Sequence, residues 1–266
     1  MSLVSSAAAL LVAAILAGAG ASARSPIRVC ADPNNMPFSN RQRQGFENRI
    51  AGVVAHDLGR PLTYFWLPQR RGFVRNSLAA GQCDMVVGVP AGYRLTQTTR
   101  AYYRSSYAFV SRSARHLHID SFDDARLPAL TIGIQLIGND YNNPPAAQAL
   151  ASRHLARNVR GFPVYGDYSK AEPQRGIVDA VARGAVDVAV VWGPVAGYFG
   201  RREHVAIDVV PVSATGDDTA PAPFAFDIAM GVRREDDALR DALDAIIVRR
   251  RGEIRQILAA YGVPLR

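Results

Sequence analysis

Apolar residues along this chain recur at two alternating spacings, and each spacing predicts a different element. Residues 27–31 form the short apolar run of a buried strand, whereas Phe46, Ile50 and Leu58 recur at helical spacing. The alternation runs to about residue 109 and restarts at residue 131. The predicted strands cover residues 27–31, 62–67, 85–89, 131–135, 160–164, 186–191 and 205–212, and the predicted helices cover about 46–58, 73–80, 146–157, 177–183, 198–199, 235–250 and 252–261.

Two longer extended segments, residues 102–110 and 224–232, stand apart from this alternation. Strands alternating with helices are typical of an α/β fold with mainly parallel sheets. Two such units separated by two crossing segments predict two lobes, one from residues 24–109 plus 225–266 and the other from 110–224. A cleft walled by the carboxyl ends of both sheets would then lie between lobes that close about a hinge.

The N-terminal 23 residues predict a secretory signal peptide. They carry no charged side chain, contain an alanine-rich apolar run, and end in Ala21-Ser22-Ala23, a small-x-small cleavage pattern. An uncleaved anchor is the alternative. Because neither this run nor any later one is long enough to span a bilayer, we expect an exported protein that is not an integral membrane protein.

The formal net charge is +8, and arginine supplies most of the positive charge. A solvated surface explains such an excess, and an acidic partner or an anionic surface is the alternative. The arginines are scattered and the chain is predicted to be exported, so we expect no nucleic-acid partner. The run at 249–251 lies within a predicted helix and indicates a solvated helix face.

The chain contains two cysteines, Cys30 and Cys83. In an exported protein a disulfide is the default, and both residues lie on predicted parallel strands of one lobe. Two isolated buried thiols are the alternative. Neither a CxxC motif nor a metal-ligand spacing is present.

Polar and aromatic residues follow the first strand at the edge where ligands of open α/β sheets bind. The loop carries Asp32, Asn34, Asn35 and Phe38, and the polar loop 138–145 of the second unit carries further oxygen-bearing residues, including Asn139 and Asp140. Such residues bind hard cations, but Asx and Pro residues also form turns without any ligand. The spacing matches no EF-hand, and we predict a polar cleft edge without a metal.

Five ordered blocks of the sequence carry a family resemblance. They are RVCADPNNMPFSN at 28–40, CDMVVGVPAGY at 83–93, TTRAYYRSSY at 98–107, PVYGDY at 163–168 and VVWGPVAGY at 190–198. On these blocks the mature chain resembles periplasmic solute-binding proteins of family 3, and within them the MxaJ/XoxJ-like subgroup associated with quinoprotein methanol dehydrogenases.

The resemblance implies a type II, Venus-flytrap fold with two mainly parallel sheets and a double-crossover hinge. It also implies a periplasmic location and a role as an accessory to PQQ-dependent alcohol oxidation. A transported solute does not follow from it.

Two positions depart from the amino-acid binders of this fold. Those proteins hold the ligand carboxylate with an arginine after the third strand of the first lobe, and here Arg94 is the only cation in that loop. They commonly hold the amine with an acid where this chain has Trp192-Gly193-Pro194. Nothing at that position neutralises an ammonium, so the sequence disfavours an amino-acid ligand. Solvated Arg94 and core-packed Trp192 are the structural alternatives to roles in the cleft.

Tyrosines concentrate near the predicted cleft loops and crossovers, where aromatic side chains suit ligand pockets, protein interfaces and hinge packing alike. We assign Tyr93, Tyr168 and Tyr198 to the predicted cleft together with Arg94 and Trp192.

The sequence contains no nucleophile motif, phosphate-binding glycine loop or HExxH, and its five histidines form no cluster. We therefore predict a protein that is not an enzyme and has no cofactor. The predicted function is a periplasmic accessory that binds a PQQ-dependent methanol or alcohol dehydrogenase and assists its maturation or activation. The alternative is the substrate-binding protein of an ABC transporter for a small organic solute other than an amino acid.

Overall fold

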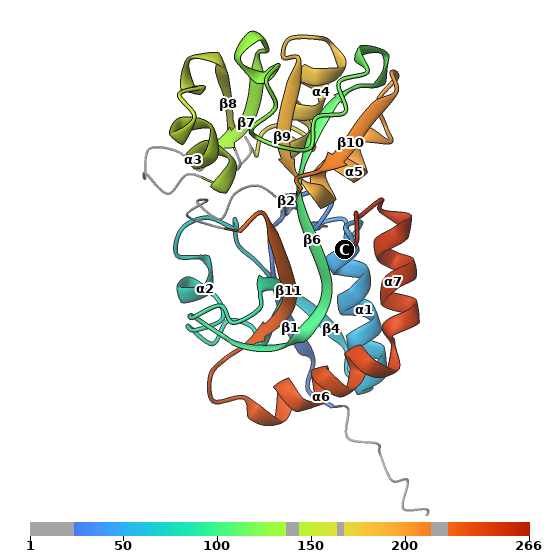
Figure 1. Cartoon of the computed structure of the whole chain (residues 1–266). Coiled ribbons are helices and arrows are strands. Elements are labelled where there is room, and N and C mark those ends of the chain that lie inside the picture. The colour runs from blue at the N-terminus through green and yellow to red at the C-terminus, as the bar shows by residue number, and fades with distance from the viewer. Residues whose placement is uncertain (1–23, 137–143, 164–167, 214–222) are drawn as a thin grey trace, which may run out of the picture.

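The structure is a computed structural model that describes residues 24–136, 144–163, 168–213 and 223–266. Its strands and helices form two lobes, one above the other, and the long strand β6 (Gln97–Arg112) runs through both (Figure 1). The predicted α/β fold with two lobes is confirmed. The exact division of the lobes, after residues 109 and 224, stays a prediction.

The sheet of the first lobe mixes parallel and antiparallel pairs. Strand β1 (Ile27–Ala31) lies between β4 (Leu62–Trp66) and β5 (Met85–Pro90) and is parallel to both. Strand β11 (Ala225–Val232) then lies antiparallel between β5 and the first part of β6. The carboxyl ends of β1 and β5 point toward the second lobe, which is why the loops after them reach the cleft.

The second part of β6 belongs to the sheet of the other lobe. It pairs antiparallel with β9 (Val188–Trp192) and with β10 (Ile207–Pro211). Strand β7 (Ile132–Leu136) is parallel to β9 and to β8 (Val159–Pro163). Because β6 pairs in both lobes, the hydrogen-bonded ladder is continuous from β4 to β8, and β6 is the structural connection between the two sheets.

Helices cover the faces of both sheets (Figure 1). The first lobe has α1 (Phe46–Leu58), α2 (Phe73–Asn76), α6 (Asp237–Arg249) and α7 (Arg251–Ala260). The second lobe has α3 (Pro145–Ser152), α4 (Gly176–Ala182) and α5 (Gly193–Gly200), and single turns of 3₁₀ helix cover Ser113–Arg115, Leu127–Ala129, Ala156–Asn158 and Pro173–Arg175.

Each lobe buries its own apolar core. In the first lobe, α1, α6 and α7 pack against the sheet through fully buried side chains such as Phe46, Ile50 and Leu258. In the second, alternate residues of β9 enter two clusters. Val190 packs on the side of α3, and Val191 packs on the side of α4 and α5. This period-two alternation explains why the strand is apolar without interruption.

Two predicted helices are shorter than their patterns suggested. The helix predicted at 73–80 is only α2, and the Ser77 hydroxyl donates to the Phe73 carbonyl at 2.6 Å where the helix ends. The helix predicted at 146–157 stops at Ser152, because His154 takes the left-handed conformation with φ 57°. In both segments the apolar periodicity continues past the last helical residue, so periodicity alone does not place the C-terminal ends of these two helices.

The arginine run at 249–251 marks a corner between two helices, and part of it is not the solvated helix face that the sequence indicated. Helix α6 ends at Arg249 and α7 begins at Arg251. Arg249 Nη2 and Arg250 Nε contact the Asp57 carboxylate of α1, the latter at 2.7 Å. Hydrogen bonds from both arginines lower the pKa of Asp57. Part of the positive charge therefore fastens the two C-terminal helices to α1.

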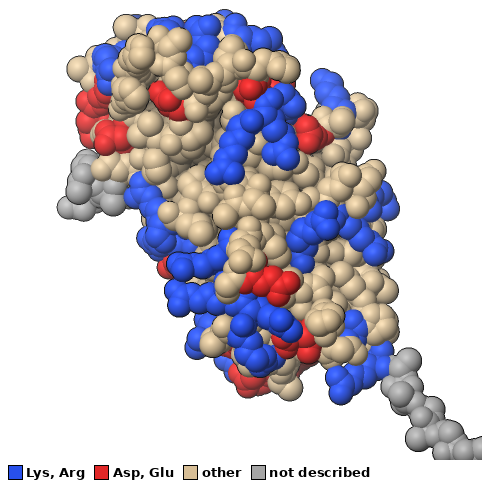
Figure 2. Space-filling view, turned by 90° about the vertical axis from the view of Figure 1, so that its right-hand side faces the viewer, with Lys and Arg blue, Asp and Glu red and all other residues tan. Residues whose placement is uncertain are grey.

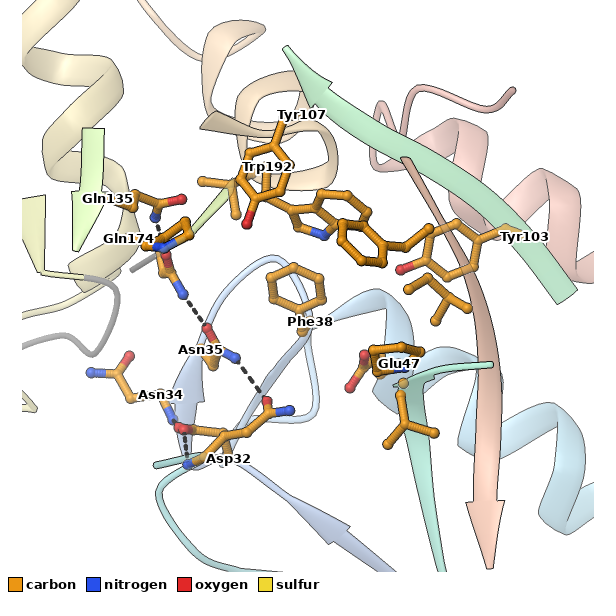
Figure 3. A pocket seen from close by; sticks show the side chains of 18 of the residues that line it. Asp32, Asn34, Asn35, Phe38, Glu47, Tyr103, Tyr107, Gln135, Gln174 and Trp192 are labelled. Carbon is orange, nitrogen blue, oxygen red and sulfur yellow. Dashed lines mark hydrogen bonds between the residues drawn. The ribbon is translucent and has the colours of Figure 1, made fainter. Parts of the chain in front are cut away.

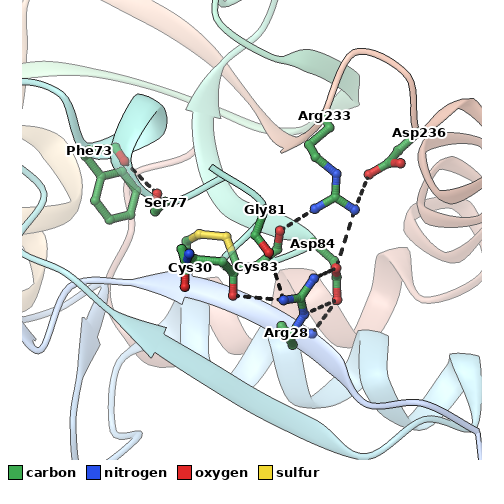
Figure 4. The surroundings of a disulfide bond; sticks show 10 residues. Arg28, Cys30, Phe73, Ser77, Gly81, Cys83, Asp84, Arg233 and Asp236 are labelled. Carbon is green, nitrogen blue, oxygen red and sulfur yellow. Dashed lines mark hydrogen bonds and ion pairs between the residues drawn. A yellow bond between two sulfur atoms is a disulfide. The ribbon is translucent and has the colours of Figure 1, made fainter. Parts of the chain in front are cut away.

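The predicted disulfide between Cys30 and Cys83 is present, with the two Cα atoms 5.5 Å apart (Figure 4). It joins β1 to the start of β5 within a small apolar cluster. Beside it, the Arg28 guanidinium contacts both oxygens of Asp84, at 2.7 and 3.3 Å, and Arg233 donates to the Cys83 carbonyl at 2.6 Å. The bridge and these charged contacts fix the strand that carries the loop at residues 32–38.

The disulfide closes a 53-residue separation, which sets its expected contribution. The chain-entropy model predicts that replacing both cysteines, Cys30→Ala with Cys83→Ala, lowers the free energy of unfolding by about 4 kcal/mol. Urea denaturation measures this change, and the reduced wild-type protein serves as the control because it should match the double variant. A loss below about 1 kcal/mol would contradict a structural role for the bridge.

Candidate functional site

A cavity of about 450 Å³ lies between the two lobes (Figure 3). The carboxyl ends of β1, β5, β7 and β9 reach it, as expected for an α/β fold. Such a volume is in the range of pockets that hold one small organic molecule. The residues that line it are Asp32, Asn34, Asn35, Phe38, Glu47, Gln69, Gly88, Val89, Pro90, Tyr103, Tyr107, Gln135, Pro144, Tyr168, Gln174, Trp192, Val195, Phe226 and Ile228.

Asp32 joins the two lobes at one edge of the cavity. Its carboxylate accepts the Tyr168 hydroxyl at 2.5 Å and the backbone N–H groups of Gln69 at 2.6 Å and Asn34 at 2.8 Å. Burial, and then the hydrogen bond to Asp32, raise the pKa of Tyr168 well above its usual value. The Arg70 guanidinium lies over the Tyr168 ring, 5.1 Å from its centroid. Asp32 is thus a satisfied acceptor that holds a tyrosine of the second lobe.

A chain of side-chain amides continues the contact between the lobes (Figure 3). Gln174 donates to Asn35 Oδ1 at 2.7 Å and accepts from Gln135 at 2.7 Å. Asn34 donates to the Lys170 carbonyl at 2.8 Å. Two asparagines of the first lobe therefore bind the second lobe directly, with no ligand between them.

The same loop forms a small hairpin that the sequence did not predict. Strands β2 (Asn34–Asn35) and β3 (Ser39–Asn40) pair antiparallel, and Met36 lies at the tip between them. Met36 is only 4% exposed, because its side chain belongs to the apolar cluster of the second lobe around α4 and α5. We call residues 34–40 the docking hairpin, since it inserts a first-lobe residue into the core of the other lobe.

Helix α5 also lies directly against the chain turn that follows α7. A Cβ atom at Gly197 would come within 1.9 Å of the Gly262 carbonyl oxygen, so this approach requires glycine. The Tyr198 and Tyr261 rings stack with centroids 5.6 Å apart. Close packing at this second contact also holds the lobes together.

Glu47 is an acid of the cavity that the sequence alone does not single out. It stands in the first turn of α1, and its carboxyl group lies over Gly88, where a Cβ atom would be 2.1 Å from Glu47 Oε1. Burial, and then the charge of Asp32, raise the pKa of Glu47 to about 8. Its place just after the cleft-edge loop was the available signal, but only the tertiary structure turns the side chain inward.

Aromatic rings form the wall that faces Glu47 (Figure 3). Tyr107, Trp192 and Phe226 contact one another edge to face, with centroids 5.4 Å apart for Tyr107–Trp192 and 5.9 Å for Trp192–Phe226. The buried Tyr103 extends this wall toward Glu47. Trp192 therefore lies in the cavity wall, as the sequence analysis proposed.

The structure brings six of the proposed cleft residues to the cavity and places three elsewhere. Asp32, Asn34, Asn35, Phe38, Tyr168 and Trp192 line it. Tyr93 packs against the cluster around the disulfide. Arg94 lies outside the cavity, and its carbonyl accepts from Arg234. Tyr198 is a core residue, 5% exposed. Asn139 and Asp140 lie outside the described residues.

The described part of the chain contains neither a metal-binding cluster nor a membrane-spanning helix. It contains no group of three or more His, Cys, Asp or Glu side chains that could hold a metal ion. None of its helices combines the length and the apolar composition that crossing a membrane requires.

Two lobes joined by a crossing strand, with a cavity between them, define the fold of periplasmic binding proteins. Two solved structures share it. Periplasmic binding protein XoxJ from Methylobacterium extorquens AM1 is 32% identical with a TM-score of 0.73, over 90% of this chain and 99% of that one. MxaJ from Methlophaga aminisulfidivorans MPT is 25% identical with a TM-score of 0.79, over 90% of this chain and all of that one.

Sequence similarity gives the family. Protein MoxJ from Methylorubrum extorquens is 32% identical over 245 residues, which cover 90% of this chain and 81% of that protein. The chain therefore belongs to the family of MoxJ and XoxJ. No family model matches the chain.

The docking hairpin generates a prediction about stability and shape. Met36→Ala removes the buried side chain and should lower the free energy of unfolding by about 2 kcal/mol or more. Because Met36 packs in the other lobe, we also expect a larger radius of gyration in small-angle X-ray scattering. Leu95→Ala, at a position 47% exposed, is the control and should change stability by less than about 0.5 kcal/mol. An unchanged radius of gyration would contradict the docking role.

The raised pKa of Glu47 generates a prediction about pH. Its pKa is about 8 in the folded protein against an ordinary 4.5, so the unfolded state releases its proton first. The contribution of Glu47 to the free energy of unfolding is therefore greatest below about pH 4.5 and falls as the pH rises toward 8. Glu47→Gln should stabilise the protein by about 1–3 kcal/mol at pH 7, because at that pH the Glu47 carboxyl is ionised in the unfolded state and mostly protonated in the folded one.

Urea denaturation of both proteins at pH 5 and pH 7 measures this effect. The stabilisation should be small at pH 5 and grow with pH. Glu235→Gln is the matched control, because the Glu235 side chain is 73% exposed and should give no such trend. If the difference in free energy of unfolding between wild type and Glu47→Gln is equal at the two pH values, the Glu47 carboxyl is ionised in the folded protein at both.

Proposed function

We propose that this protein is a periplasmic accessory of PQQ-dependent methanol or alcohol oxidation. It binds the dehydrogenase and assists its maturation or activation. Membership of the MoxJ and XoxJ family supports this role, and the relative XoxJ is a periplasmic binding protein. The apolar N-terminal segment, residues 1–23, is the proposed export signal and lies outside the described residues.

The observation that carries the proposal is an arginine-lined hollow of about 400 Å³ on the first lobe. Five exposed arginines, from β6, α7 and the last residue of the chain, surround it. Within the described residues, Asp227 is the only acid that lines it, and Asp227 pairs with Arg104 at 2.8 Å. The arginines are Arg100, Arg104, Arg251, Arg255 and Arg266.

Apolar side chains lie among these arginines. Val248 is 54% exposed and Leu265 is 41% exposed, and both line the hollow. Figure 2 shows the side of the molecule that bears the C-terminal helices, where blue side chains are spread over the first lobe with acidic ones between them. Exposed apolar residues within a ring of arginines are typical of a protein-binding surface. The partner that fits this one presents acidic side chains.

The contacts between the lobes favour a binding scaffold over a transport receptor. A receptor of this fold signals its solute by closing around it, which requires a closed state that depends on the solute. Here Asp32, Asn35 and Met36 join the lobes by direct contacts. A closed form that its own side chains hold presents one constant surface to a partner.

The test is a binding measurement between the mature protein and the PQQ-dependent dehydrogenase of the same cell, in apo and holo forms. Biolayer interferometry should detect binding that weakens as salt rises. Arg251→Glu with Arg255→Glu should weaken it by roughly tenfold or more, because two attractive charges become repulsive. Arg160→Glu, half that charge change at an exposed position of the second lobe, is the control and should have little effect.

Two outcomes would contradict this proposal. The wild-type protein could bind neither form of the dehydrogenase at low salt. Alternatively, Arg160→Glu could weaken binding as much per charge as the paired variant, which would place the effect in the net charge of the protein and not in the hollow.

A second candidate function is the substrate-binding protein of an ABC transporter, for a small organic solute other than an amino acid. The cavity between the lobes favours it by its volume and aromatic wall. No Arg, Lys or His among the described residues lines that cavity, so the carboxylate of an amino acid would lack a cationic partner. A thermal shift produced by one solute and a change of lobe closure on binding would support this alternative.

A further inference from the structure

We infer that the cavity between the lobes binds a small organic monocation, a protonated amine or a quaternary ammonium compound, between Glu47 and the rings of Tyr103, Trp192 and Phe226. This inference goes beyond the accessory function and does not depend on it. It assigns the cavity a ligand of definite charge, where the sequence offered no group for an ammonium.

The charge of the cavity is the first argument. Its described lining contains two acids, Asp32 and Glu47, and no basic side chain, although the whole protein has a formal net charge of +8. A cavity of this charge repels anionic ligands and attracts cations. The contrast with the arginine-rich exterior shows that the composition of the lining does not follow that of the chain.

The availability of the two acids is the second argument. Asp32 already accepts three hydrogen bonds, from Tyr168, Gln69 and Asn34. Within the described residues, no hydrogen bond or ion pair engages the Glu47 carboxyl group, which lies over Gly88 and faces the cavity (Figure 3). A partly buried acid without a cationic partner is costly to ionise, and a bound cation would remove that cost.

The aromatic wall is the third argument. The Trp192 and Phe226 rings contact each other edge to face, 5.9 Å between centroids, and the Tyr103 side chain also lines the cavity. Aromatic faces attract organic cations through the ring quadrupole, and Trp does so most strongly. A carboxyl group opposed by several rings is the arrangement that holds an ammonium group while its alkyl or aryl part packs in the apolar space.

Proton linkage gives this inference a specific signature. The titratable groups that act on Glu47 or respond to its charge are Asp32, Tyr64, Tyr102 and Tyr103, and burial keeps the three tyrosines protonated by raising their pKa values above 10. With a pKa of about 8, Glu47 is mostly protonated at pH 7 and must lose its proton when a cation binds. Affinity should therefore rise about 50-fold from pH 6 to pH 8, and binding at pH 7 should release about 0.9 proton.

Isothermal titration calorimetry of the mature protein tests the inference with two pairs of probes. Phenethylammonium is compared with neutral 3-phenylpropan-1-ol, and choline with neutral 3,3-dimethylbutan-1-ol. We expect the cation of at least one pair to bind tenfold or more tightly than its neutral partner. Titrations in buffers of different ionisation enthalpy measure the released proton.

Glu47→Gln should weaken binding of the cation at pH 8 by tenfold or more and leave the affinity for the neutral probe unchanged. It should also abolish the proton release and the pH dependence of cation binding. Glu235→Gln is the matched control and should bind as the wild type does. If Glu47→Gln does not fold, the rise in wild-type affinity between pH 6 and pH 8 still decides the question.

Three results would overturn the inference. The neutral probes could bind as tightly as the cations, Glu47→Gln could keep full affinity for the cation, or neither cation could bind at about 10 mM. Dehydrogenase binding is measured separately on the arginine-lined hollow, so failure of either proposal leaves the other standing.

Discussion

The docking of Met36 into the core of the second lobe is the contact on which the arrangement of this molecule depends. A first-lobe residue completes an apolar cluster around α4 and α5, and the two asparagines before it contact Lys170 and Gln174. A buried methionine contributes to stability only while its surroundings stay closed around it, so its burial ties the stability of the second-lobe core to the position of the first lobe. The cavity exists as a defined volume because this contact fixes the distance between its walls.

The disulfide supports the same contact from the other side. Cys30 lies two residues before Asp32 and is bonded to the start of β5, while Arg28 and Arg233 converge on Asp84 beside it. The hairpin therefore projects from a strand that is held covalently and by ion pairs. Docking a hairpin costs less conformational entropy when its base is already fixed, which lets a two-residue ladder hold its shape at the junction of two lobes.

Elements with a strong local period were predictable from the sequence, and features created by the approach of the lobes were not. The order of strands and helices, the two lobes and the disulfide followed from periodicity and cysteine chemistry. The sequence of the docking hairpin indicates only a turn-rich loop, because Asn34 and Asn35 suit a turn whatever they contact. The sequence does not distinguish a cleft position from a core position for Tyr198, because aromatic residues suit both cores and interfaces. Glu47 does not stand out in the sequence, because an acid in the first turn of a helix ordinarily needs no further explanation.

The two proposed binding sites share one pair of strands. Along β11 and β6, Ile228 lies opposite Tyr103 and both line the cavity, while the next pair, Asp227 and Arg104, lines the arginine-lined hollow. Tyr103 lines the hollow as well, so the two sites meet at this residue. A shift of this strand pair would change both sites together. The cation and the partner protein could then each alter the affinity of the site for the other. The size of that effect is limited by how much more tightly each of them binds to one position of the strands than to another.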